Sequence, residues 1–495
     1  MNHPPWQNFV FTLLLVGLFP GPGRAVDEVY HGDPAQPYLP VQGSFAPTAR
    51  TTYLPLSGTW KRENRGGQTV ETVVPVCWPA GDETVRLSTR FRVPDSLAGR
   101  YQRIVFWGAR RHVAVTVNGR LLEARSGDWP FFSVDLPPGL LRTDTPNELV
   151  IELDGRLSAN RSIPLKPKAY DNRLYAGLFG DVALVAGPTV SVESMRWESD
   201  LAEEGKAARW RIRLGLRNQR IALRDSSAAR SLKIHVEWRP LGRGVAGRTA
   251  PVDVALDPVE IAEVDLSGEV GAPSLWSCDQ PRLYRFDIVF TEGSESWKVP
   301  LDVGFRDLQW RDGGLFLNGK QLEIRGIDLR LETPERGAAL APAEIDRALR
   351  KIKEKGFNLV RVIGSPPHPR VAEACDRIGL LLVPTTGLRG VPESLLAGEV
   401  FLTRLEGVLE EMNHWFGSHP SVAAWGVGEA LPLTAGTLDL LSNLEKGTIA
   451  EDGRPLLVSF ASNAVMPLPP GVVGVREFPP YAEREGFDEN LQGKG

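Results

Sequence analysis

The chain has little cysteine and little long apolar sequence. Its 495 residues include three cysteines, Cys77, Cys278 and Cys375, which lie far apart. An odd number of widely spaced thiols defines no disulfide framework, so we interpret them as structural thiols. After an apolar run at residues 9–19, no stretch is long and apolar enough to form a membrane helix. The sequence therefore predicts no integral membrane segment in the mature chain.

Motifs typical of cofactor and metal enzymes are also absent. No glycine-rich phosphate loop follows a predicted strand, and no Gly-x-Ser-x-Gly motif occurs. The formal net charge is −4 and no block of lysine or arginine occurs, which argues against nucleic-acid binding. We therefore expect no cofactor, no metal and no nucleic-acid partner. The histidines of the mature chain show no metal-ligand spacing; they are His31, His112, His235, His368, His414 and His419.

Glycine, proline and tryptophan, in contrast, are plentiful. The chain contains 50 glycines, 40 prolines and 13 tryptophans, a composition that suits loop-rich β architecture. Its length suggests about three domains. We interpret most of the tryptophans as core residues.

The first residues have the features of a secretory signal peptide. The apolar run at residues 9–19 has the appropriate length, and Gly23-Arg24-Ala25 offers a small-x-small cleavage site before Val26. No cysteine follows the run, so no lipoprotein anchor is expected. We predict a signal peptide at residues 1–25 and an exported protein, periplasmic or extracellular.

Two regions of alternating strands follow. Within residues 26–187, residues 86–93 alternate with period two, and Asn118-Gly119 predicts a tight hairpin turn. Within residues 188–302 the alternation resumes, for example at residues 210–216 and 284–290. These patterns predict two β-sandwich domains.

From residue 303 onward, strands alternate with helices. Residues 343–355 predict a helix that buries Ile345, Leu349 and Ile352 and stops at Gly356. Such alternation is typical of parallel strands joined by right-handed crossovers. We predict six strands, at residues 322–327, 358–363, 380–383, 422–427, 455–460 and 472–475.

Several motifs resemble those of glycoside hydrolase family 2, the β-galactosidases and β-glucuronidases. The likeness extends from about Leu56 to Tyr481. It implies a jelly-roll sugar-binding-like domain at residues 26–187, an immunoglobulin-like sandwich at 188–302 and an incomplete (β/α)8 TIM barrel at 303–495. The motifs include Val115-Thr116-Val117-Asn118-Gly119, Gly304-Phe305-Arg306, Phe357-Asn358-x-Val360-Arg361, Cys375-Asp376-Arg377-x-Gly379 and His419-Pro420-Ser421-Val422.

The same resemblance identifies the catalytic positions. The acid/base Glu of the family follows the fourth strand; an ungapped alignment from Trp425 puts Ala430 there, with Glu429 in the preceding Asn position. The family's nucleophile ends the seventh strand, and this sequence has no counterpart to it. The family's polar residues after the second and third strands are replaced by Gly364 and by the segment 384–387. The resemblance therefore implies an O-glycosyl hydrolase scaffold with a degenerate active site.

Other carboxylates near the strand ends offer an alternative. Retaining glycosidases use two carboxyl groups about 5–5.5 Å apart. A one-residue shift would make Glu429 the acid, and Glu477, after the sixth strand, could act as the nucleophile. The candidate substrate-binding residues at the same end are Trp425, Asp328, Arg330 and Glu332.

Two functions therefore remain open. The first is a catalytically degenerate protein with a carbohydrate-binding or assembly role; the alternative is an active β-glycosidase with a non-standard carboxylate pair. A truncated gene product, with further strands encoded elsewhere, is a third possibility. A sheet of six strands has two open edges, and open edges favour pairing with other chains. We therefore expect a homodimer or a partner protein that completes the barrel.

Overall fold

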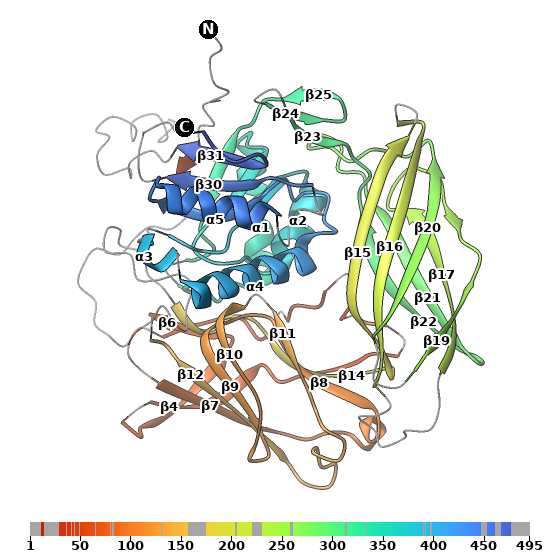
Figure 1. Ribbon diagram of the computed structural model, residues 1–495. Helices are drawn as coiled ribbons and strands as arrows, with labels where there is room; N and C mark the ends of the chain where they lie inside the picture. Colours follow the sequence, from red (N-terminus) through yellow and green to blue (C-terminus); the bar gives the residue numbers. More distant parts are fainter. Residues whose placement is uncertain are drawn as a thin grey trace, which may run out of the picture.

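The computed structural model has three parts, two all-β and one in which strands and helices alternate (Figure 1). Most of the predicted signal peptide, and Glu477, lie outside the described residues. The structure describes residues 11–13, 29–35, 37–40, 42–43, 45–48, 50–64, 66–79, 81, 84–129, 131–156, 175–202, 205–219, 230–257, 261–311, 314–333, 335–389, 391, 393–396, 398–446, 453–460 and 467–476.

The first part contains two antiparallel sheets. One has the order β2-β6-β13-β9-β12-β7-β4-β5, with β10 paired to β9, and the other has the order β11-β8-β14-β3. Apolar side chains from both sheets pack into one core. The elements are β2 (Tyr30–His31), β3 (Thr52–Pro55), β4 (Gly58–Glu63), β5 (Thr69–Val74), β6 (Val76–Pro79), β7 (Thr84–Phe91), the short 3-10 helix η1 (Asp95–Leu97), β8 (Tyr101–Phe106), β9 (Ala109–Val117), β10 (Arg120–Trp129), β11 (Phe132–Asp135), β12 (Asn147–Asp154), β13 (Tyr175–Leu178) and β14 (Val182–Gly187).

Strand β9 illustrates how sequence pattern sets this architecture. Every second residue from Ala109 to Val117 is buried, as a strand with one face on a core requires. The turn to β10 has φ of 50° at Asn118 and 80° at Gly119. Two positive φ angles in a two-residue loop match the twist of antiparallel strands. The predicted hairpin turn is therefore confirmed.

The second part is also built from antiparallel sheets around one core. A three-stranded sheet has the order β15-β16-β20, and a five-stranded sheet has the order β18-β17-β21-β22, with β19 paired to β17. The strands are β15 (Val190–Ala202), β16 (Ala207–Asn218), β17 (Arg230–Pro240), β18 (Gly247–Arg248), β19 (Val252–Leu256), β20 (Ile261–Gly271), β21 (Tyr284–Glu292) and β22 (Glu295–Val303).

A small antiparallel sheet then leads into the parallel strands of the third part. The parallel strands form two groups, in the orders β1-β26-β27-β28 and β29-β30-β31. Parallel bridges such as Leu382↔Val422 and Thr385↔Gly426 join the two groups. The elements are β23 (Leu308–Arg311), β24 (Gly314–Leu317), β25 (Lys320–Leu322), β26 (Gly326–Leu329), β27 (Leu359–Val362), β28 (Leu381–Pro384), β29 (Trp425–Leu431), β30 (Leu456–Phe460), β31 (Val472–Arg476) and, from near the N-terminus, β1 (Phe11–Leu13).

Helices connect and cover these strands. Helix α1 (Pro342–Glu354) buries Ile345, Leu349 and Ile352, which confirms the predicted stripe. The others are α2 (Arg370–Ile378), α3 (Glu393–Leu396), α4 (Glu399–Phe416) and α5 (Ala435–Lys446). Helix α4 faces both all-β parts, because it contacts β10 and β15 (Figure 1). None of the helices in the described ranges has the length and apolarity that crossing a membrane requires.

Two predicted strands were misplaced by a few residues. The first parallel strand is residues 326–329, not 322–327, because residues 320–322 pair as β25 in the preceding antiparallel sheet. The fourth is residues 425–431, not 422–427. Two carboxylates that were expected just after these strands therefore lie inside them. Asp328 lies within β26 and Glu429 within β29.

An N-terminal connecting segment, residues 37–43, joins all three parts. The main-chain N–H of Tyr38 donates to Asp181 in the first part at 2.6 Å, and its hydroxyl donates to Glu373 of α2 at 2.7 Å. The Gln42 amide donates to His419 Nε2 at 2.8 Å, and its oxygen accepts from the N–H of Asp302 in the second part at 2.7 Å. Four long-range hydrogen bonds, made by Tyr38 and Gln42, thus fix the relative placement of the parts.

Candidate active site

The end of β29 turns the Glu429 side chain into the protein. The pairing of β29 with β30 shifts register between Gly426 and Gly428 and again before Leu431, so the strand is irregular there. Ala430 has φ of 48°, and its N–H donates to the Ser459 hydroxyl at 3.1 Å. The N–H of Glu429 donates to the carbonyl of Leu388 at 2.8 Å. The residue is consequently only 1% exposed.

The Glu429 carboxylate is bound to an arginine of the neighbouring segment. Arg389 Nη1 lies 2.6 Å from Glu429 Oε2, and the two residues also form a parallel bridge. The other carboxylate oxygen lies 3.4 Å from the N–H of Gly364, after β27. A charge-assisted bond at 2.6 Å is at the strong end for a nitrogen donor. Arg389 is a residue that the sequence argument did not identify.

Arg330 and Glu332, which follow β26, form a second ion pair at the same end of the strands. Arg330 Nη1 lies 3.2 Å from Glu332 Oε1. A Cβ atom placed on Gly364 would lie 3.9 Å from Arg330 Nη2. The structure therefore brings two predicted site residues, Arg330 and Glu429, close to one glycine.

Arg110 reaches this end from the first part of the molecule. Its Nη2 donates to the Ser365 hydroxyl at 2.6 Å, and its guanidinium lies 4.4 Å from the ring centroid of Phe179. The two hydrogen-bonded residues are 255 positions apart in the chain. No local pattern could have identified Arg110, because the contact depends on how two separate domains pack.

The space between these side chains is small. Arg110, Arg330, Glu332, Gly364 and Ser365 line a cavity of about 50 Å³. Ligand pockets for small molecules typically measure about 300–1,000 Å³. The cavity therefore has no room for a sugar ring in this conformation.

The segment after β28 closes the strand ends further. A Cβ atom on Gly387, whose φ is 78°, would lie 2.6 Å from the carbonyl oxygen of Gly364, so the two main chains touch. The hydroxyls of Thr385 and Thr386 donate to the carbonyls of Val362 and Val427 at 2.8 and 2.6 Å. These threonines serve the packing of strand ends and are not directed at a ligand.

Asp328 is part of a buried structural ion pair. Arg361 of β27 lies opposite Asp328 in the pairing of β26 with β27, and its guanidinium donates to both carboxylate oxygens at 2.6 and 2.5 Å. The Asp328 side chain is 7% exposed and the Arg361 side chain is 2% exposed. Because Asp328 lies inside the strand, it cannot project into the loop region as expected.

Trp425 also differs from the expectation. It is the first residue of β29, at the opposite end of the strand from Leu431, and is fully buried. The Arg454 guanidinium lies 5.6 Å from its ring centroid. Trp425 is therefore a core side chain here and does not line the strand ends near Glu429. Glu477 lies outside the described residues.

Buried thiols and imidazoles add no reactive group. Cys77, Cys278 and Cys375 are buried and free, as predicted, and burial raises the pKa of each; that of Cys77 rises to about 12. Burial, followed by the charge of Arg370, lowers the pKa of His368 to about 3. Within the described ranges, no group of three or more His, Cys, Asp or Glu side chains is placed to hold a metal ion.

Comparison with known proteins finds likeness to glycoside hydrolase family 2. A family model described as "Glycosyl hydrolases family 2, TIM barrel domain" matches residues 308–448. The chain is 26% identical over 392 residues to the β-galactosidase of Photobacterium profundum, covering 72% of this chain and 34% of that protein. It is 28% identical over 266 residues to the β-galactosidase of Pectobacterium atrosepticum, covering 51% of this chain and 25% of that protein.

Solved structures show a similar fold. β-Glucuronidase 2 of Bacteroides uniformis superposes with a TM-score of 0.73 at 20% identity, covering 83% of this chain and 53% of that one. The β-glucuronidase of Parabacteroides merdae superposes with a TM-score of 0.70 at 20% identity, covering 82% of this chain and 55% of that one.

The chain thus spans about a third or less of the matched β-galactosidases and about half of the matched β-glucuronidases. It is a mostly β, multidomain protein with a family 2 TIM-barrel domain. These likenesses and the predicted motifs agree, and the chain is a glycoside hydrolase family 2-like protein.

Proposed function

We propose that the chain is a carbohydrate-associated protein on a family 2 scaffold and that its strand-end site does not hydrolyse glycosides. The Glu429–Arg389 ion pair carries this proposal. A general acid must present a proton to the leaving oxygen. An ionised carboxylate can only accept hydrogen bonds, and Glu429 accepts from Arg389 at 2.6 Å while only 1% exposed.

The surrounding space supports the same proposal. The cavity beside Arg330 and Gly364 measures about 50 Å³, and the Gly364 and Gly387 main chains are in contact. The position that matches the family's acid/base is Ala430, whose side chain has no proton to give. In this proposal a substrate would meet no accessible acid at Glu429 or Ala430.

Hydrolysis assays test this proposal. Purified protein should not cleave aryl β-galactosides, β-glucuronides or β-mannosides above the rate in buffer. Removal of one catalytic group costs nearly as much as removal of all, so a partial site should give no measurable turnover. Turnover that disappears in Glu429→Gln but persists in Glu332→Gln would overturn the proposal.

The alternative is an active β-glycosidase with a non-standard carboxylate pair. One observation favours it: Glu429 and Arg330 converge on Gly364, so two polar side chains share one place at the strand ends. In this alternative Glu429 acts as the acid after Arg389 moves away, and Glu477 acts as the nucleophile.

The remaining parts of the proposal concern domain types and location. The two all-β parts would be a jelly-roll sugar-binding-like domain and an immunoglobulin-like sandwich, as the family resemblance implies. The protein would be exported by a signal peptide at residues 1–25 and act in the periplasm or outside the cell. Comparing the N-terminal residue of protein purified from an export fraction with Met1 tests this last part.

A further inference from the structure

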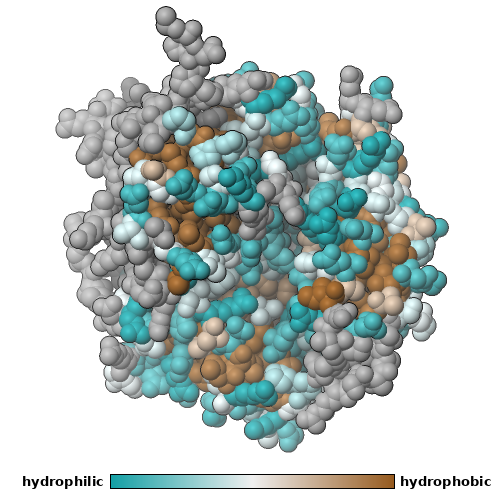
Figure 2. Space-filling model, in the orientation of Figure 1, coloured by the Kyte–Doolittle hydropathy of each residue, from teal (hydrophilic) through white to brown (hydrophobic). Residues whose placement is uncertain are grey.

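A large cleft lies between the second part and the strand starts of the third. It has a volume of about 730 Å³, within the range of ligand-binding pockets. Its position is opposite to the strand ends around Glu429, because Pro420 and Pro455 in its lining precede β29 and β30. Figure 2 shows hydrophilic side chains where these two parts of the molecule meet. We call this space the junction cleft.

One wall is the outer face of the three-stranded sheet. Arg196 and Arg213 lie opposite each other in the pairing of β15 with β16, so their side chains share a face. Glu198 lies 3.2 Å from Arg196 and 4.0 Å from Arg213. Asp200, on the same face of β15, is exposed. This wall therefore presents hydrogen-bond donors and hydrogen-bond acceptors side by side.

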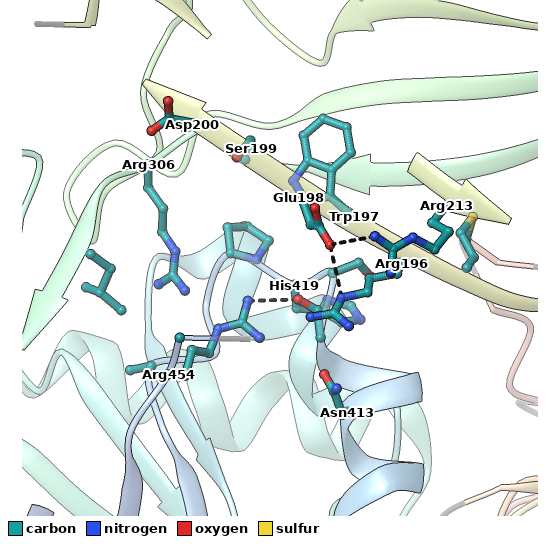
Figure 3. A pocket seen from close by; sticks show the side chains of 18 of the residues that line it. Arg196, Trp197, Glu198, Ser199, Asp200, Arg213, Arg306, Asn413, His419 and Arg454 are labelled. Atoms are coloured by element: carbon teal, nitrogen blue, oxygen red, sulfur yellow. Dashed lines mark hydrogen bonds and ion pairs between the residues drawn. The ribbon is translucent and has the colours of Figure 1, made fainter. Parts of the chain in front are cut away.

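The opposite wall belongs to the third part. Arg306 donates to the carbonyl of Val422 at 2.6 Å, and Arg454 donates to the carbonyl of Gly417 at 2.7 Å, so main-chain groups hold both guanidinium groups in place. Figure 3 shows Arg196, Glu198 and Asp200 above and Arg454 and Asn413 below, with Arg306 extending between Asp200 and Arg454.

Aromatic surface completes the lining. Trp310 lines the junction cleft and is partly exposed, whereas the Trp197 ring packs on the core of the second part, with its centroid 4.9 Å from that of Phe286. The Trp310 indole N–H donates to the carbonyl of Ala423 at 3.0 Å, which fixes the orientation of its ring. A held aromatic ring beside paired donors and acceptors suits a ligand with apolar faces and many hydroxyl groups.

We propose that the junction cleft binds an oligosaccharide at a site separate from the strand ends. The lining mixes carboxylates with guanidinium groups, so it matches a neutral, polyhydroxylated ligand better than a polyanion. Each sugar hydroxyl can donate to Glu198 or Asp200 and accept from an arginine. The inference rests on the proposed carbohydrate-associated function, and it moves the binding site to the other end of the barrel strands.

Titration calorimetry with two probes, β-1,4-linked galactotetraose and cellotetraose, tests the proposal on the full chain. At least one should bind, and Glu198→Gln should weaken binding about tenfold, as loss of one charge-assisted hydrogen bond predicts. The matched control is Glu269→Gln, which removes a glutamate paired with Arg209 on the same sheet, outside the cleft. This control should bind like the wild type. If Glu198→Gln does not fold, Asp200→Asn replaces it.

A second readout locates the ligand without substitution. Bound saccharide should slow hydrogen exchange of residues 194–200 and 413–420 and leave residues 364–389 unchanged. Any of four results would overturn the proposal. They are equal binding by the wild type and the cleft variants, protection only at residues 364–389, no binding of either saccharide, and binding of heparin alone. Recovery of intact saccharide after titration separates this result from hydrolysis, which would instead contradict the proposed function.

Discussion

At the scale of single residues, buried charges decide what this protein can do. Glu429 lies near the end of β29 and Asp328 lies inside β26, and each carboxylate is paired with an adjacent, largely buried guanidinium. Removing one partner of such a buried pair lowers the free energy of unfolding, because the remaining charge is left buried and unpaired.

Removing Arg389 should therefore destabilise the protein strongly. The Glu429 side chain is 2% exposed, so Arg389→Met leaves a buried carboxylate, and we expect a loss of about 3 kcal/mol in the free energy of unfolding by urea. The double variant Arg389→Met/Glu429→Gln should recover part of that loss. As a control, Arg209→Met breaks an exposed pair and should cost below about 1 kcal/mol. Equal losses in both single variants would contradict this reading.

His368 should make stability depend on pH. Its pKa in the folded state, about 3, lies below the value of about 6.5 in an unfolded chain. The unfolded state therefore binds a proton first, and stability that is full above pH 6.5 is lost as the pH falls from 6.5 towards 3. Protonation would also disrupt the bond from the N–H of Arg370 to His368 Nδ1 at 3.1 Å.

The ring keeps partial exposure, so we expect a loss of about 1 kcal/mol between pH 7 and pH 5. Urea unfolding at both pH values measures it. The loss should be about 1 kcal/mol smaller in His368→Gln, and the same pH dependence in both proteins would disprove this role.

At the scale of elements, helix ends show which glycines the fold requires. Helices α1 and α2 are each followed by a glycine with positive φ, 86° at Gly356 and 79° at Gly379. The two sites differ in their surroundings. A Cβ atom on Gly356 would meet open space, whereas one on Gly379 would lie 2.2 Å from the carbonyl oxygen of Cys278.

Alanine substitutions at these sites should separate the two effects. Gly356→Ala adds only backbone strain and should cost about 1 kcal/mol. Gly379→Ala adds a clash with the segment between β20 and β21 of the second part, and should cost roughly 3 kcal/mol. Chemical unfolding of the two variants gives the comparison. If the two costs are the same, the close contact at Gly379 does not constrain the fold.

At the scale of the whole molecule, the parallel sheet determines how the chain meets other chains. In the described residues, β31 pairs on one side only, and β26 has β1 on its outer side. Strand β1 lies within the predicted signal peptide. Signal-peptide cleavage would therefore expose the edge of β26, and open strand edges favour pairing with other chains.

We therefore predict association, as a homodimer or with a partner protein. Light scattering over a concentration series should show a mass that increases with concentration, and more strongly when residues 1–25 are absent. The full chain is the matched control, because it keeps β1 beside β26. A monomer at every concentration in both forms, without co-purifying protein from the native host, would contradict the prediction.

The sequence by itself determined the local elements. The apolar stripe of α1, the Asn118-Gly119 turn and the alternation of strands and helices depend on neighbours within a few residues, so their periodicity predicted them. The motif resemblance identified the family for the same reason, since each motif is a short local segment.

Only the tertiary structure decided the state of the candidate site. The Glu429–Arg389 pair joins residues 40 positions apart, and the Arg110–Ser365 contact joins residues 255 positions apart, so both depend on how strands and domains pack. The end of β29 is likewise set by its pairing with β30. Glu429 was expected in the loop after the strand, but it lies within β29 and is buried. The sequence names the carboxylate, but the partner and the burial that govern its chemistry come from segments distant in the chain.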